Sequence, residues 1–86
     1  MRTGRVVAGL VYRRLVDGAM IYDPRDQTVH HLNETAACVW EACQRGASRE
    51  EAAAFLCRDY EVDPERAAGD VDAIVARFAA ARLLAP

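Results

Sequence analysis

The chain has 86 residues, a formal net charge of −2 and 52% hydrophobic residues. This length fits one small domain, expected here over residues 1–86. The sequence has 11 arginines and no lysine, and without lysine neither Schiff-base chemistry nor a P-loop can be built. The slight acidic excess also argues against non-specific nucleic-acid binding, which relies on neutralising phosphates.

The cysteines and the hydropathy both point to a cytoplasmic protein. Cys38, Cys43 and Cys57 are odd in number and form no C-x-x-C motif, so a reducing compartment is expected rather than a disulfide framework. The apolar run Val6–Val11 is too short for the hydrophobic part of a signal peptide. No stretch approaches the roughly 18 apolar residues of a membrane-spanning helix, so no membrane association is expected.

Three strands of an antiparallel sheet are predicted in the first third of the chain. Val6–Val16 is rich in β-branched residues and is followed by Asp17-Gly18, a strong hairpin signal. Ala19–Tyr22 is the second predicted strand, and Asp23–Asp26 has the residues of a turn. Thr28–Leu32 is the third predicted strand.

Three helices are predicted after the sheet, each with its own start signal. Asn33 is a good N-cap for the first helix, which ends at Gly46. Ser48 opens the second with a capping box, and Asp63-Pro64 opens the third. The fold class is therefore α+β, a three-stranded antiparallel sheet followed by a three-helix, winged helix-turn-helix-like bundle.

The helical spacing also predicts the core. The last helix has an apolar stripe that ends at Arg82, whose stem would be buried, and Leu83–Pro86 would leave the helix as a short tail. The residues expected in the core are Leu32, Ala36, Val39, Trp40, Cys43, Ala52, Phe55, Leu56, Tyr60, Ala67, Val71, Ile74, Val75 and Phe78.

No catalytic or metal-binding pattern is found, so neither an enzyme nor a cofactor is expected. His30 and His31 are adjacent on a strand and point to opposite faces, so they cannot share a metal ion. His30 should share the face of Leu32. The three cysteines are spread over two predicted helices. Burial on or beside an apolar helix face would keep the thiols of Cys43 and Cys57 protonated.

Several short motifs, in order, resemble the PqqD-like family. The segment from His31 to Trp40, HLNETAACVW, is similar to the family's "x-L-N-x-T-A-x-x-(V/I)-(W/L)" pattern. Tyr22-Asp23-Pro24, GASREE from Gly46 and YEVD from Tyr60 also match it. Near the end, Ala81-Arg82 stands where a glycine is common. The resemblance covers about residues 10 to 84, and the VDPERAAGDV run is most similar to small lasso-peptide pathway proteins.

The resemblance implies a peptide-binding function. Such proteins, also called RiPP recognition elements, bind the leader of a ribosomally synthesised precursor peptide as an added strand, in a groove walled by the last helix. A modifying enzyme, such as a leader protease, a cyclase or a radical SAM enzyme, would be the second partner. The edge strand would supply Gln27, Thr28, Val29, His30, His31 and Leu32, and one flank of the last helix would supply Asp70, Ile74, Arg77 and Ala81.

Two other functions remain open from the residues alone. A winged-helix DNA-binding regulator would need a basic patch, whereas acids and arginines balance on the predicted third helix. A structural or assembly subunit could form a homodimer through the same sheet edge.

Overall fold

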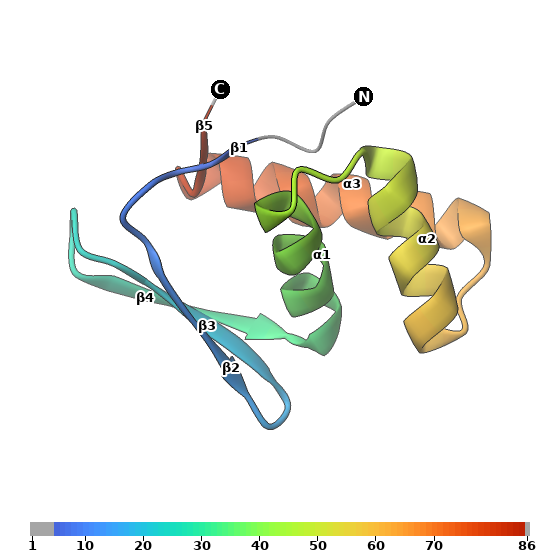
Figure 1. Ribbon diagram of the computed structural model, residues 1–86, viewed down its shortest axis with the longest axis horizontal. Coiled ribbons are helices and arrows are strands. Elements are labelled where there is room, and N and C mark those ends of the chain that lie inside the picture. The colour runs from blue at the N-terminus through green and yellow to red at the C-terminus, as the bar shows by residue number, and fades with distance from the viewer. Residues whose placement is uncertain (1–4, 86) are drawn as a thin grey trace.

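The computed structural model describes residues 5–85; Met1 to Gly4 and Pro86, parts of the expected domain and tail, lie outside the described residues. Figure 1 shows a sheet on one side and three helices on the other. The order is β1 (Arg5–Val6), β2 (Val11–Leu15), β3 (Gly18–Asp23), β4 (Thr28–Asn33), α1 (Glu34–Gln44), α2 (Arg49–Tyr60), α3 (Pro64–Ala80) and β5 (Leu84–Ala85). The predicted α+β class, with a three-stranded antiparallel sheet and three helices, is confirmed.

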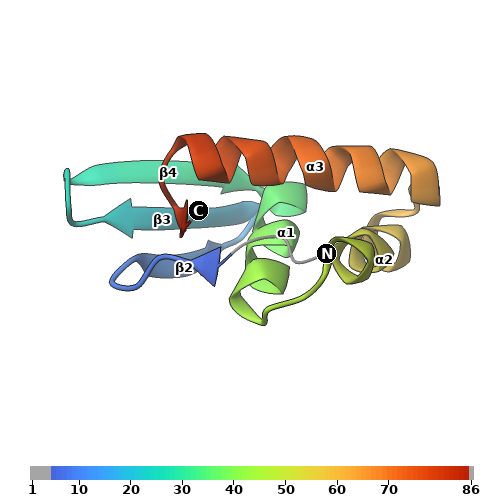
Figure 2. The ribbon, with the colours of Figure 1, turned by 90° about the horizontal axis from the view of Figure 1, so that it is seen from above.

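The main sheet has β3 at its centre, with β2 and β4 at its edges. Both pairings are antiparallel, and Ile21 of β3 lies opposite Tyr12 and His30. Ile21 is fully buried, so this row of residues faces the helices. Figure 2 shows β4 as the strand nearest to α3 and β2 as the farthest.

The first predicted strand, Val6–Val16, is wrong as a continuous element. The chain turns at Ala8-Gly9, where Gly9 has a φ of +90° that favours glycine. The residues before the turn form β1, which pairs with β5, and Val7 N–H donates to the Leu83 carbonyl at 3.1 Å. The apolar tail therefore returns to the sequence start as a strand, giving a second, two-stranded sheet that the local pattern did not predict.

The hairpin between β2 and β3 lies one residue earlier than predicted. Its loop residues are Val16 and Asp17, and Gly18 is the first residue of β3, paired with Leu15. A Cβ on Gly18 would overlap the carbonyl oxygen of Leu32. Glycine is thus needed here for the close approach of β4 rather than for the turn.

All three predicted helix starts are confirmed by their capping hydrogen bonds. Ala36 N–H donates to the Asn33 side chain at 2.8 Å, and Arg66 N–H donates to Asp63 at 2.8 Å. Ser48 and Glu51 form the reciprocal capping box. These side chains satisfy amide groups that have no partner within the helix.

The C-terminal ends of α1 and α3 share a Schellman geometry. After α1, Gly46 has a φ of +73° and Ala47 N–H donates to the Ala42 carbonyl at 3.0 Å. After α3, Arg82 takes the equivalent position with a φ of +63°. The prediction that Arg82 continues the buried stripe is therefore wrong: the residue lies beyond the helix and is exposed.

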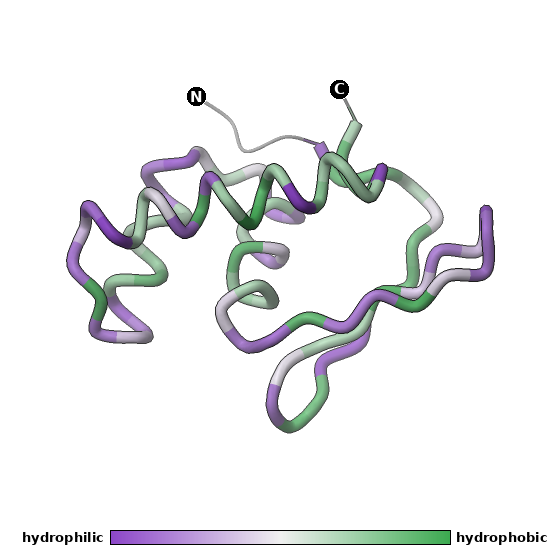
Figure 3. The backbone as a smooth tube through the Cα atoms, turned by 180° about the vertical axis from the view of Figure 1, so that it is seen from behind, coloured by the Kyte–Doolittle hydropathy of each residue, from purple (hydrophilic) through white to green (hydrophobic). Residues whose placement is uncertain are grey.

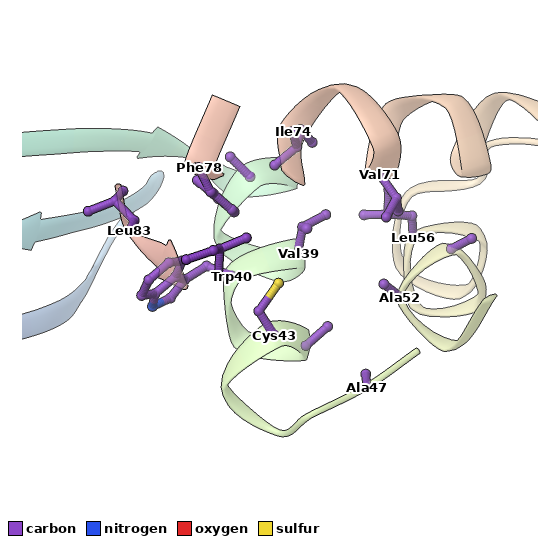
Figure 4. Packing of buried hydrophobic residues seen from close by; sticks show 14 of the residues in the cluster. Val39, Trp40, Cys43, Ala47, Ala52, Leu56, Val71, Ile74, Phe78 and Leu83 are labelled. Carbon is purple, nitrogen blue, oxygen red and sulfur yellow. The ribbon is translucent and has the colours of Figure 1, made fainter. Parts of the chain in front are cut away.

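The core lies between the sheet and the three helices, as Figure 4 shows. Trp40 is fully buried, and its ring packs edge-on against Phe78 of α3, with centroids 5.2 Å apart. Tyr12 of β2 lies 6.4 Å from the same indole and donates its hydroxyl proton to Glu41 at 2.6 Å. Burial and that hydrogen bond raise the pKa of Tyr12 to about 12. Because α1 contacts both β3 and α3, it connects the two layers.

Most of the predicted core is confirmed, with four partial exceptions. Hydrophobic and hydrophilic residues alternate along α3 in Figure 3, as the helical spacing predicts. Leu32, Phe55, Tyr60 and Val75 are only half-buried, although they pack against the buried cluster. Among the helices of residues 5–85, none combines the length and the hydropathy that a membrane span requires.

Candidate functional site: an open sheet edge and the adjoining groove

The outer edge of β4 offers main-chain groups for pairing. Within residues 5–85, β4 pairs only with β3. The Leu32 carbonyl is directed at Gly18 of β3, and main-chain groups alternate in direction along an antiparallel strand. The N–H and C=O groups of His30 therefore also face β3, whereas those of Val29 and His31 face the open edge.

A groove of about 350 Å³ lies between this edge and α3. The floor and both walls come from segments that are far apart in the sequence. The residues that line the groove are Val29, His30, His31, Leu32, Ala36, Ile74, Arg77, Phe78, Ala81 and Leu83.

Seven of the ten predicted site residues meet in this groove. They are Val29, His30, His31, Leu32, Ile74, Arg77 and Ala81. Ala81 is the C-cap residue of α3 and not part of its helical flank. Ile74 and Arg77, three residues apart on α3, lie on one side of the helix. Ala81 lines the same groove from the position directly after the helix.

The other three predicted residues do not line the groove. Gln27 belongs to the turn before β4 and has a φ of +59°, so the edge begins one residue later, at Thr28. Thr28 faces β3 at the start of the strand and pairs with Asp23. Asp70 lies in the second turn of α3 and forms an ion pair with Arg66, with 3.9 Å between Asp70 Oδ2 and Arg66 Nε.

Three groove residues were predicted only as core or tail. Ala36, Phe78 and Leu83 come from α1, α3 and the segment after α3. Their apolar spacing gave a signal for burial, but not for a groove. Leu83 reaches the groove because the chain reverses at Arg82, which the local pattern did not predict.

A cluster of hydrogen bonds ties the two sides of the groove together at one end. Arg25, in the turn before β4, donates to both oxygens of the buried Asp23, with Nη2 at 2.7 Å from Oδ2. The same Nη2 donates to the Arg82 carbonyl at 2.6 Å, directly after α3. The bond from Arg25 holds the pKa of Asp23 below its usual range. This contact fixes the end of α3 against the turn that leads into β4.

A larger hollow, of about 630 Å³, lies between α2 and α3. It is lined by three alanines, Pro64 and Cys57, and by the charged residues Arg49, Glu50 and Arg58. None of these lining residues belongs to a strand. The groove beside β4 is therefore the better candidate site, because it joins apolar surface with unpaired main-chain groups.

Two observations on the described residues concern nucleophilic and metal-assisted chemistry. Burial raises the pKa of the Cys38 thiol, which disfavours the nucleophilic thiolate. Residues 5–85 contain no group of three or more His, Cys, Asp or Glu side chains that could hold a metal ion. On the exposed side of the helices, Arg49 pairs with Asp72 and Arg66 with Asp70, so these arginines do not form a free basic patch for DNA.

Two solved structures have the same fold. The chain of "TbiB1 in Complex with the TbiA(beta) Leader Peptide" has a TM-score of 0.83 and 20% identity, with 93% of each chain covered. "Lasso peptide synthetase B1 complexed with the leader peptide" has a TM-score of 0.84 and 27% identity, with 95% of this chain and 96% of that chain covered. A comparison with curated proteins finds no match. The family model described as coenzyme PQQ synthesis protein D matches residues 18–84, more than half of the sequence, and the chain therefore belongs to the PqqD family.

Proposed function

We propose that this protein binds the leader of a ribosomally synthesised precursor peptide and presents it to modifying enzymes. The observation that carries the proposal is the open edge of β4, whose Val29 and His31 main-chain groups border a groove walled by α3. A peptide added as a strand would satisfy these groups and place alternate side chains in the groove.

The two parts of the site would have different roles. Main-chain pairing is independent of sequence, and each hydrogen bond contributes about 0.5–1.5 kcal/mol net. Burial of one large apolar side chain against Ile74 and Phe78 contributes about 1.5–3 kcal/mol. The edge thus supplies general affinity, and the groove selects among leaders.

Family membership and the similarity to a leader-bound lasso peptide synthetase B1 support this proposal. By that similarity, we infer a lasso-type pathway, with a leader protease, a cyclase or a radical SAM enzyme as the partner. The protein itself would be non-catalytic. Its three free cysteines fit the reducing conditions of the cytoplasm, the proposed location.

The test is an N-methyl scan of the leader of a precursor peptide encoded beside the gene. Each methyl group removes one main-chain donor of the peptide and leaves the protein unchanged. If the leader binds as a strand, affinity should fall with a period of two residues, because only alternate amides face β4. A scan without that period would contradict strand addition.

The matching change on the protein is His31→Pro, which removes an outward donor of β4. The control is His31→Val, which keeps the donor and suits a strand. We expect the proline alone to weaken binding, by about tenfold, with both variants folded by circular dichroism. If the proline variant unfolds, the N-methyl scan decides the question alone. Concentration-dependent dimerisation of the free protein, abolished by the same proline, would instead favour pairing between two copies.

A further inference from the structure

The ionisable side chains that line the groove are all basic. They are His30, His31 and Arg77. The whole chain has 13 carboxylate residues and a net charge of −2, yet none of the groove-lining residues is Asp or Glu. The charge of the groove therefore differs in sign from that of the chain.

Arg77 has no carboxylate partner, whereas half of the ten arginines within residues 5–85 have one. Arg14, Arg25, Arg49, Arg58 and Arg66 each form an ion pair. Within residues 5–85, Arg77 forms no ion pair and no side-chain hydrogen bond, although it lines the groove from the last turn of α3. Its five N–H donors remain available to a ligand.

We propose that the bound leader carries an Asp or Glu side chain that pairs with Arg77; this rests on the proposed function. In an added strand, side chains on one face point toward α3. Ile74 is one turn from Phe78, and both offer apolar surface. Arg77 precedes Phe78 and is exposed, so it lies at the rim. The leader would combine a large apolar residue for the groove with a carboxylate for its rim.

The guanidinium favours a carboxylate over other acceptors because its planar fork can donate two parallel hydrogen bonds. The contact is partly exposed, so we expect its loss to weaken binding by about three- to tenfold. The ion pair with Arg77 would act mainly on selectivity, because a bound leader that lacks the acid would leave Arg77 desolvated and unpaired. Lysine at position 77 would keep the charge but not the fork, and should restore the affinity only in part.

The first experiment identifies the preference without a known leader. A display library of random 12-residue peptides, each fused at its C-terminus so that it has no free carboxylate there, is selected on the immobilised protein. We expect one Asp or Glu at a fixed spacing from a large apolar residue. The same selection on Arg77→Glu should replace the acid by a basic residue. Arg13→Gln, which removes an exposed arginine on the far strand β2, is the control and should keep the acid.

The second experiment measures the coupling. A selected peptide and its Glu→Gln (or Asp→Asn) form, both amidated at the C-terminus, are titrated into the wild type and Arg77→Gln. The acid should improve the affinity for the wild type about three- to tenfold and have little effect on the variant. The difference should shrink in 0.5 M salt, since exposed ion pairs are screened.

The outcomes separate this inference from the proposed function. Peptides that bind along β4, as shown by the N-methyl scan, but have no acid preference would overturn the inference and leave the proposed function intact. An acid preference that survives Arg77→Glu would overturn it as well. If no peptide is enriched, or if the enriched peptides show no period of two in the scan, both proposals fail.

Discussion

Replacing Trp40 by alanine should remove most of the stability of the protein. The indole is fully buried between Tyr12 and Phe78. Truncating such a side chain costs about 3–5 kcal/mol, and a domain of this size is stabilised by roughly 5 kcal/mol in total. We therefore expect the variant to retain at most about 2 kcal/mol, so that a measurable fraction unfolds at 25 °C.

Trp40→Phe is the matched control, because it keeps an aromatic ring in the core and removes the indole N–H donor. Trp40 Nε1 is buried and has no hydrogen-bond partner within residues 5–85. Removing an unpaired buried donor relieves about 1–3 kcal/mol, which offsets part of the loss from a smaller ring. The expected net change is below about 1.5 kcal/mol.

Urea unfolding followed by circular dichroism at 222 nm measures both variants without relying on tryptophan fluorescence. With a slope of about 1 kcal/mol per M, Trp40→Ala should unfold at or below roughly 2 M urea, and Trp40→Phe close to the wild type. A midpoint for Trp40→Ala within about 1 M of the wild type would show that the indole does not hold the sheet to the helices. The packing argument would then be wrong.

Four further changes test the groove and its supports. Ala81→Trp should fill the groove beside β4 and weaken leader binding about ten- to a hundredfold. Fluorescence anisotropy of a labelled leader measures the binding, and a melting curve of the variant measures its stability separately. Gly18→Ala should destabilise the protein by about 2 kcal/mol or more, because its Cβ would overlap the backbone of β4; an unchanged urea midpoint would contradict that close approach. Arg82→Gly should stabilise it by about 1 kcal/mol, since a left-handed φ of +63° suits glycine; calorimetry would show the higher melting temperature. Arg25 lowers the pKa of Asp23, so the pairing of the two side chains stabilises the fold above about pH 4. This stabilisation is lost as the pH falls through the lowered pKa of Asp23. Arg25→Gln should therefore move the midpoint of acid unfolding to higher pH, and an unmoved midpoint would contradict the stabilising role of the pair.

The sequence by itself determined the elements that rest on local chemistry. Asn33, Ser48 and Asp63 cap the predicted helices because their side chains accept hydrogen bonds from amides only three residues away. Helical spacing likewise predicted that Val71 and Phe78 are buried and that Ile74 and Arg77 share a flank. Each of these features depends on residues within a few turns of one another.

Only the tertiary structure decided the features that join distant segments. The reversal at Arg82 lets β5 pair with β1, and the β-branched composition of Val6–Val16 gave no sign of the break at Gly9. The requirement for Gly18 comes from the Leu32 carbonyl of the neighbouring strand. The groove itself forms because β4, α1, α3 and the segment after α3 converge, and Arg25 binds the Arg82 carbonyl across 57 residues. Local propensity cannot report such contacts, because their energy arises only when the segments have packed together.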